Sequence, residues 1–192
     1  MTLTSGKTVI LVNGIPASGK STVAQALAHH FGLPYLALDG IKEPFMSRLD
    51  NVDRALNRRL GCAAYDAIWS IVAQAPECCT YVIDAWFGFQ PREPLRHYLR
   101  EAGVVQPLEV WNQISGELAA ERYGSRIGQR SKGHPGAEYL PELRALAERA
   151  TPMAIGPVFR VEQAQPVEIG RIVDWLAEYG IGDANIGKRM AG

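Results

Sequence analysis

The chain has 192 residues, of which 47% are hydrophobic and 21% are charged. This composition is typical of a globular protein and excludes a disordered chain. The 20 Lys and Arg residues balance the 20 Asp and Glu residues, so the formal net charge is zero. A neutral chain lacks the broad basic field of a general DNA- or RNA-binding protein, although it can still contain a local cationic site.

The cysteines and the first residues indicate the compartment. Cys62, Cys78 and Cys79 form no CxxC pair and no Cys/His metal motif, so we expect free thiols in a reducing environment. The apolar run at residues 9–12 is too short for a signal sequence or a membrane span. We therefore expect a cytoplasmic protein with no membrane partner and no nucleic-acid partner. Whether it is a monomer or a homodimer stays open.

Apolar, β-branched runs alternate with amphipathic segments, which is typical of an α/β fold with a parallel sheet. In chain order, we expect a strand at residues 8–12, a helix at about 20–31, a strand at 35–38, a helix at about 53–75, a strand at 81–83, a helix at about 92–102, a strand at 108–111, a helix from the N-cap Ser115 to about 126, a helix at about 141–150, a strand at 158–161 and a last helix from near 166. These elements predict one domain, residues 1–192, with a three-layer α/β/α fold around a five-stranded parallel sheet. The tail at 180–192 is expected to be loose.

A phosphate-binding motif follows the first expected strand. Residues 14–21 read GIPASGKS, which matches G-x-x-x-x-G-K-[ST] and leads directly into a helix. We expect nucleotide contacts from Gly14, Ala17, Ser18, Gly19, Lys20, Ser21 and Thr22. Lys20 can reach the β- and γ-phosphates, and the Ser21 hydroxyl can bind Mg²⁺. The alternative is that these residues form only a tight turn between a strand and a helix. A true phosphate-binding site would indicate that the protein binds a nucleotide, but not which reaction it catalyses.

Two carboxylates end the second and third expected strands, where an open parallel sheet binds its ligands. Phosphoryl transfer needs one group that orients or deprotonates the acceptor hydroxyl and another that helps to hold Mg²⁺. We assign Asp39 as the acceptor base and Asp84 to the metal and the substrate. The two roles could be exchanged, and each Asp could instead cap the segment that follows it.

Three arginines point to a cationic lid at about residues 122–137. Arg122, Arg126 and Arg130 recur every four residues, so they share one face if the helix continues. We expect Arg122 to contact the nucleotide, and Arg126 or Arg130 to stabilise the transferring phosphate. The alternative is a solvated cationic helix face. We assign no catalytic role to His134, because a histidine in a Gly-His-Pro-Gly turn is usually just exposed.

Side chains near the two carboxylates form a candidate acceptor site. Trp86 and Phe87 follow Asp84 directly and could stack against a sugar or an aromatic acceptor. The alternative for Phe87 is packing beneath the loop. Glu43 and Arg48 follow Asp39 closely and could bind acceptor hydroxyls or charges.

Four segments carry a resemblance to a known group: GIPASGKST at 14–22, LDGIKE at 38–43, YVIDAWF at 81–87 and ERYGSRIGQR at 121–130. The chain resembles P-loop small-molecule kinases of the group of chloramphenicol phosphotransferase, zeta-toxin-type kinases and gluconate kinase. The resemblance implies a five-stranded parallel sheet, use of ATP and Mg²⁺, and phosphorylation of a hydroxyl. It also implies that the acceptor base is Asp39 and that the loop at 162–165 contacts adenine.

The prediction is an ATP-dependent phosphotransferase that moves the γ-phosphate to a hydroxyl of a small molecule, such as a sugar, a sugar derivative or an antibiotic. The alternative is a toxin-like or regulatory nucleotide-binding module that acts on a cell-wall precursor or a macromolecule. A third, weaker alternative is a binding protein without turnover. The sequence leaves open the acceptor and the preference for ATP over GTP.

Overall fold

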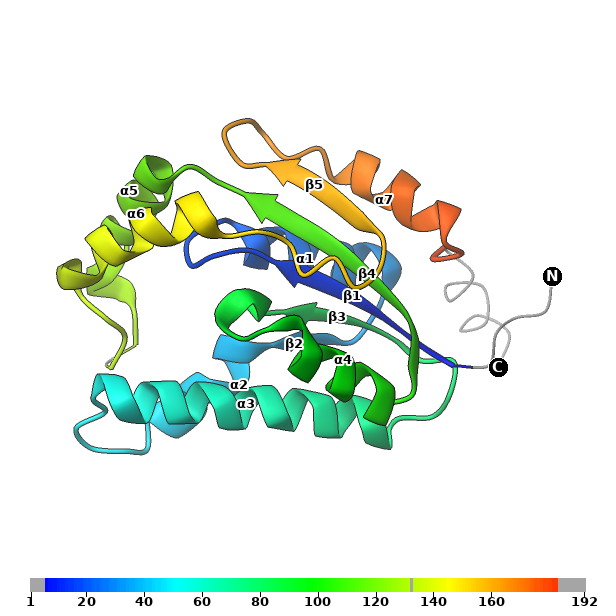
Figure 1. Cartoon of the computed structure of the whole chain (residues 1–192), viewed down its shortest axis with the longest axis horizontal. Helices are drawn as coiled ribbons and strands as arrows, with labels where there is room; N and C mark the ends of the chain where they lie inside the picture. Colours follow the sequence, from blue (N-terminus) through cyan, green and yellow to red (C-terminus); the bar gives the residue numbers. More distant parts are fainter. Residues whose placement is uncertain (1–5, 132, 183–192) are drawn as a thin grey trace.

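A computed structural model describes residues 6–131 and 133–182 of the chain. The strands are β1 (Lys7–Asn13), β2 (Tyr35–Ala37), β3 (Thr80–Asp84), β4 (Val104–Gln113) and β5 (Val158–Glu162). They form a five-stranded sheet in the order β2-β3-β1-β4-β5, and every neighbouring pair is parallel. The predicted fold class is therefore confirmed (Figure 1). The predicted tail lies outside the described residues from 183 onward.

Helices cover both faces of the sheet. They are α1 (Lys20–Phe31), α2 (Leu38–Met46), α3 (Arg54–Gln74), α4 (Arg92–Glu101), α5 (Gly116–Gly124), α6 (Leu140–Arg149) and α7 (Ile169–Glu178), with short 3₁₀ turns at Phe87–Phe89, Ile127–Gln129 and Ala137–Tyr139. Side chains alternate across a strand, so Val9 and Leu11 of β1 face α3 and α4 while Ile10 and Val12 face α1 and α7. This two-sided burial explains why β1 is continuously apolar.

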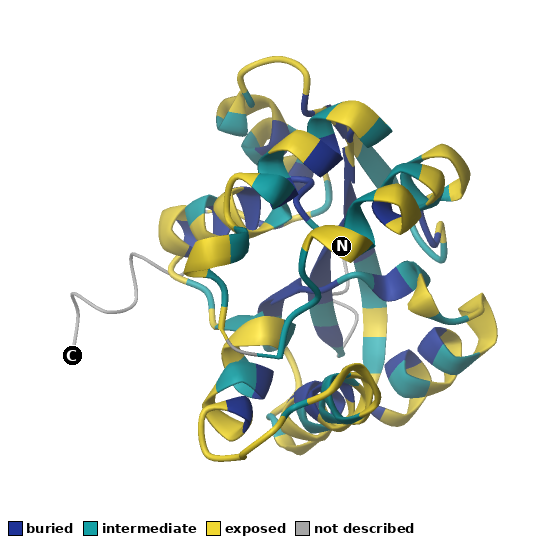
Figure 2. Ribbon diagram, turned by 90° about the vertical axis from the view of Figure 1, so that its left-hand side faces the viewer, coloured by how far each residue is buried: buried dark blue, intermediate teal, exposed yellow. Residues whose placement is uncertain are grey.

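All strands point to the same edge of the sheet, and α5 and α6 pack beyond that edge (Figure 1). Ile15 of the loop after β1 packs there against Tyr123 of α5 and Leu143 of α6, in a third apolar cluster. Figure 2 shows the molecule from this side, with buried strands in the centre and helices exposed on their outer faces. The packing holds the loop after β1 between the sheet and the α5–α6 pair.

Several elements differ from the predictions. Helix α2 was not predicted. Gly40 and Pro44 are poor helix formers, but Leu38 and Ile41 pack against the core and hold a nine-residue helix together. Strand β4 begins at Val104 rather than at residue 108. Helix α5 ends at Gly124, two residues earlier than expected.

None of the helices within residues 6–131 and 133–182 combines the length and the apolarity that crossing a bilayer requires.

Candidate active site

The loop between β1 and α1 has a backbone conformation that two glycines make possible. Gly19 has a φ of 81°, which is the left-handed region, and a β carbon there would collide with Gln163 Oε1. A β carbon at Gly14 would collide with Ser18 Oγ. The loop is therefore a tight backbone cradle that leads into the N-terminus of α1, which is the arrangement that binds phosphate.

A buried polar network braces this loop from beneath. Asn13 Oδ1 accepts a hydrogen bond from the Gly14 amide at 2.8 Å, and Asn13 Nδ2 donates to Glu109 Oε1 at 2.7 Å. Glu109 also accepts from the amides of Met153 and Ala154 at 2.9 and 2.8 Å. Glu109 is only 2% exposed, so the network fixes the start of the loop relative to β4 and to the segment before β5.

A cavity of about 850 Å³ lies at the edge where the strands end. Its lining includes most of the predicted site residues, namely Ala17, Gly19, Lys20, Ser21, Thr22, Asp39, Glu43, Asp84, Trp86, Arg126 and Arg130. They come from segments that are far apart in the sequence, and the parallel topology brings them to one edge. The residues that line the cavity without having been predicted include Tyr35, Lys42, Arg54, Asn57, Arg58 and His134.

Asp39 lies in the first turn of α2, not at the end of β2 as the sequence suggested, because the strand already ends at Ala37. Its Oδ1 forms an ion pair with Lys42 Nζ at 2.8 Å, one helical turn away. Burial raises the pKa of Asp39, but the ammonium groups of Lys42 and Lys20 outweigh it and lower the pKa below the usual 3.8. Asp39 is therefore ionised at neutral pH and can accept a hydrogen bond from a hydroxyl.

Asp84 is the last residue of β3, as predicted, and it is 5% exposed. Its Oδ2 accepts a hydrogen bond from the Tyr35 hydroxyl at 2.8 Å. Burial and the Asp84 carboxylate raise the pKa of Tyr35, so this hydroxyl stays a donor. Asp84 Oδ1 is buried and has no hydrogen-bond partner among the described residues, so one carboxyl oxygen of this cavity-lining residue remains unsatisfied.

The three arginines do not share a helix face, because α5 ends at Gly124. Arg122 points to the loop after β5, where its Nη1 and Nη2 donate to Gln163 Oε1 and the Gln163 carbonyl at 3.2 and 2.9 Å. Arg126 is exposed at the cavity, and its Nε donates to the Arg122 carbonyl at 3.0 Å. Arg130 stacks over the Tyr123 ring at 4.6 Å. Only Arg126 and Arg130 of the three line the cavity.

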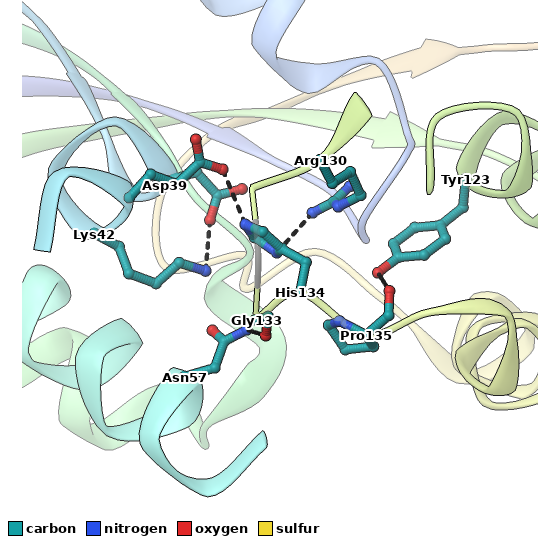
Figure 3. Close-up of polar contacts among 9 residues, drawn as sticks. Asp39, Lys42, Asn57, Tyr123, Arg130, Gly133, His134 and Pro135 are labelled. Atoms are coloured by element: carbon teal, nitrogen blue, oxygen red, sulfur yellow. Dashed lines mark hydrogen bonds and ion pairs between the residues drawn. The ribbon is translucent and has the colours of Figure 1, made fainter. Parts of the chain in front are cut away.

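His134 is a cavity residue rather than an exposed turn residue, which corrects the sequence-based interpretation. Its side chain is 5% exposed. Its Nδ1 lies 3.0 Å from Arg130 Nη2, and its Nε2 lies 2.9 Å from Glu43 Oε1 (Figure 3). No sequence signal indicated this position, because the contacts join α2 to a loop some 90 residues further along the chain.

The ligand atoms of Asp39, Glu43 and His134 lie within 4.8 Å of one another, which is a spacing that a metal site could use. However, an arginine only donates hydrogen bonds, so Nδ1 of His134 must be the acceptor and Nε2 must carry the proton. The protonated Nε2 donates to Glu43, and Lys42 neutralises Asp39. The hydrogen bonds and ion pairs of this cluster therefore require no metal ion.

Two predicted substrate residues are not at the cavity. Phe87 is fully buried and packs edge-on against Tyr65 in the core beside α3, because its side chain points to the opposite side of the loop from Trp86. Arg48 is exposed in the turn after α2 and does not line the cavity. The expectation that these two side chains contact a substrate is therefore corrected, and the alternative of packing beneath the loop holds for Phe87.

No family model and no curated protein matches the chain. Among solved structures, it is similar to a Chloroflexus aurantiacus protein provisionally described as a kinase, with 27% identity, a TM-score of 0.75, and coverage of 92% of this chain and 97% of the other. A gluconokinase from Sinorhizobium meliloti has 24% identity and a TM-score of 0.55, with 88% of each chain covered. A shikimate kinase from Acinetobacter baumannii has 15% identity and a TM-score of 0.58, with 92% and 95% covered.

The chain thus has the fold of the P-loop small-molecule kinases, with the phosphate-binding loop of that class in place. The resemblance inferred from the sequence is confirmed at this level.

Proposed function

We propose that this protein transfers the γ-phosphate of ATP to a hydroxyl of a small molecule. One observation carries the proposal: the phosphate-binding loop, with Lys20, and an ionised carboxylate, Asp39, line the same cavity. Arg126 and Arg130 line the same cavity. Phosphoryl transfer depends mainly on positioning and on stabilising negative charge, and this set of groups supplies both.

Asp39 is proposed to accept the proton of the acceptor hydroxyl, or to orient that hydroxyl for attack on the γ-phosphorus. The bond from phosphorus to the ADP oxygen breaks as the new bond to the acceptor oxygen forms. Lys20 is proposed to contact the phosphates, and Arg126 or Arg130 to neutralise the charge that develops on the transferring group. Arg122 is proposed to support the nucleotide indirectly, through the loop after β5.

The residues also fit a Mg²⁺ ion. Asp84, whose buried Oδ1 has no hydrogen-bond partner among the described residues, and Ser21 both line the cavity, and hard oxygen ligands such as a carboxylate and a hydroxyl suit Mg²⁺. When bound, the ion would offset phosphate charge. Asp84 is fixed for this role by the hydrogen bond from Tyr35.

A small acceptor is favoured over a macromolecular one. A volume of about 850 Å³ is within the range of pockets that bind small ligands and is enough for a nucleotide tail and a compact acceptor. The acceptor end carries ionic and amide groups, Arg54, Asn57 and Arg58 among them, which suits a hydroxylated polar molecule.

The test is a mass-shift screen for phosphorylated products, using ATP, Mg²⁺ and a library of sugars, sugar acids, nucleosides and antibiotics. We expect one acceptor class to gain a phosphate, and we expect Lys20→Ala and Asp39→Asn to abolish the gain. Asp39→Asn should still bind ATP, and Asp174→Asn, on the exposed surface of α7, is the matched control. Transfer at the wild-type rate by Asp39→Asn, or growth arrest on expression that Lys20→Ala relieves, would contradict the proposal.

A further inference from the structure

We propose that His134 is a positioning residue that fixes the Arg130 guanidinium in the cavity through Nδ1 and ties it to the acceptor helix α2 through Glu43. This inference rests on the proposed function, because Arg130 acts there on the transferring phosphate. It assigns a role to a residue whose role no sequence pattern indicated.

The backbone around His134 is anchored on both sides. Asn57 Nδ2 of α3 donates to the Gly133 carbonyl at 2.5 Å, and the Tyr123 hydroxyl of α5 donates to the Pro135 carbonyl at 2.8 Å. Figure 3 shows His134 between these two contacts, with its ring directed toward Arg130 and α2. The backbone on both sides of His134 is therefore held by α3 and by α5.

The His134 side chain connects Arg130 to helix α2. Nδ1 accepts from Arg130 at 3.0 Å and Nε2 donates to Glu43 at 2.9 Å, and Glu43 lies one turn after Asp39 on the same helix. The Arg130 guanidinium also stacks over the Tyr123 ring, but its Nε has no hydrogen-bond partner among the described residues, so the bond to His134 is important for its orientation. His134 thus sets the distance between the proposed base and the proposed arginine.

This arrangement requires a neutral imidazole. A proton on Nδ1 would remove the acceptor and put a positive charge beside the Arg130 guanidinium. The charged groups that face His134 are Arg130 from its own segment and Asp39, Lys42 and Glu43 from α2, while α3 adds Arg54 and Arg58 to the cavity wall. Burial, Lys42 and Arg130 lower the pKa of His134 from 6.5, against the smaller effects of Asp39 and Glu43.

The kinetic test is a double-mutant cycle with the acceptor found in the screen. We expect His134→Leu to lower kcat by at least about ten-fold, with little change in the KM for ATP. In an Arg130→Ala background, the same change should cause no further loss, because His134 acts through Arg130. His29→Leu, on the exposed face of α1, is the control. Losses that multiply in the double variant would overturn the proposal.

The pH test uses a variant that keeps both bonds. A glutamine amide can accept from Arg130 and donate to Glu43 but cannot take up a proton in this range. His134→Gln should keep kcat within about three-fold of wild type at pH 8 and should lose the acidic decline in kcat that wild type shows below pH 6.5. A wild-type decline that His134→Gln leaves unchanged would overturn the proposal.

A measurement without catalysis separates this inference from the proposed function. Nitrogen-15 NMR of the imidazole rings follows the titration of His134 in the free protein, and His134→Gln identifies its signals. Arg130→Ala should raise the pKa of His134, because it removes a neighbouring cation and the donor to Nδ1. No change would overturn the contact itself. A change in a protein that phosphorylates nothing would refute only the proposed function.

Discussion

Arg122 of α5 donates two hydrogen bonds to Gln163, one to the side-chain oxygen at 3.2 Å and one to the carbonyl at 2.9 Å. Gln163 Nε2 in turn donates to Asn112 Oδ1 at 2.9 Å, and Asn112 Nδ2 donates to the Asn13 carbonyl at 3.0 Å. A continuous polar chain therefore runs from α5, past the loop after β5, to the start of the phosphate-binding loop. The loop after β5 and the phosphate-binding loop, which are expected to contact the adenine and the phosphates of one nucleotide, are therefore held by the same chain of hydrogen bonds.

We predict that Arg122→Ala weakens ATP binding by about ten-fold, or about 1.4 kcal/mol, because it removes two hydrogen bonds from a charged group that hold the loop after β5, and only part of their contribution to stability reaches the bound nucleotide. Arg122→Lys should recover little of the loss, because an ammonium cannot reproduce the paired geometry of the guanidinium. Isothermal titration with a non-hydrolysable ATP analogue measures both. Arg171→Ala, on the exposed side of α7, is the control, and an unchanged Kd in Arg122→Ala would refute the prediction.

The phosphate-binding loop itself is tested by Gly19→Ala. The φ of 81° disfavours any β carbon, and the Gln163 side chain that it meets is buried and hydrogen-bonded, so it has no free position to move to. We expect a loss of about 1–3 kcal/mol in the free energy of unfolding and no rise in melting temperature on adding ATP. Gly170→Ala is the matched control, because nothing lies within 4 Å of a β carbon at that helical position. Its stability should be unchanged or slightly higher.

Glu109→Gln tests the network beneath that loop. The carboxylate accepts three hydrogen bonds in a buried setting, and an amide would turn an NH₂ group toward at least one of those donors. We expect the free energy of unfolding in urea to fall by about 1–3 kcal/mol. Glu148→Gln, a surface position on α6, should change it by less than about 0.5 kcal/mol. A Glu109→Gln protein as stable as wild type would mean that the network contributes nothing to the fold.

Trp86 and Phe87 are adjacent in sequence but should respond differently to alanine substitution. Phe87 is fully buried, so Phe87→Ala should cost about 3–5 kcal/mol of stability. Trp86 lines the cavity, so Trp86→Ala should mainly raise the KM for the acceptor. Chemical denaturation and acceptor kinetics on both variants separate the two effects. If Phe87→Ala is as stable as wild type and has a changed KM for the acceptor, Phe87 contacts the substrate and the prediction is wrong.

Stability should depend on pH through His134 and Asp39 in two separate ranges. The folded-state pKa of His134 is lowered from 6.5, so the unfolded chain binds the proton more readily and stability falls as the pH drops below 6.5 toward that lowered value. The pKa of Asp39 is lowered from 3.8, so its contribution is present above 3.8 and is lost as the pH falls through the lower folded value. Melting temperatures measured between pH 8 and pH 3 follow both. In His134→Gln the first decline should be smaller, and the second should remain, because Lys42 and Lys20 still lower the pKa of Asp39.

Local patterns in the sequence predicted the sheet and the phosphate-binding loop. The β-branched runs and the spacing GIPASGKS act over a few neighbouring residues, and the parallel topology then places the end of each strand at one edge. The helix after β2 was not predicted: Gly40 and Pro44 are poor helix formers, and the packing of Leu38 and Ile41 against the core stabilises the helix. Because this helix was not predicted, Lys42 was not recognised as a neighbour of Asp39, from which it is one helical turn away.

What the sequence by itself determined is the class of fold, the phosphate-binding loop and the edge of the sheet where Asp39 and Asp84 lie. Only the tertiary structure decided which long-range partners these residues meet: Glu43 with His134, Arg122 with Gln163, and Phe87 with the core. The physical reason is that periodicity and turn chemistry act over neighbouring residues. Contacts between side chains about 40 to 90 residues apart depend on how whole elements pack.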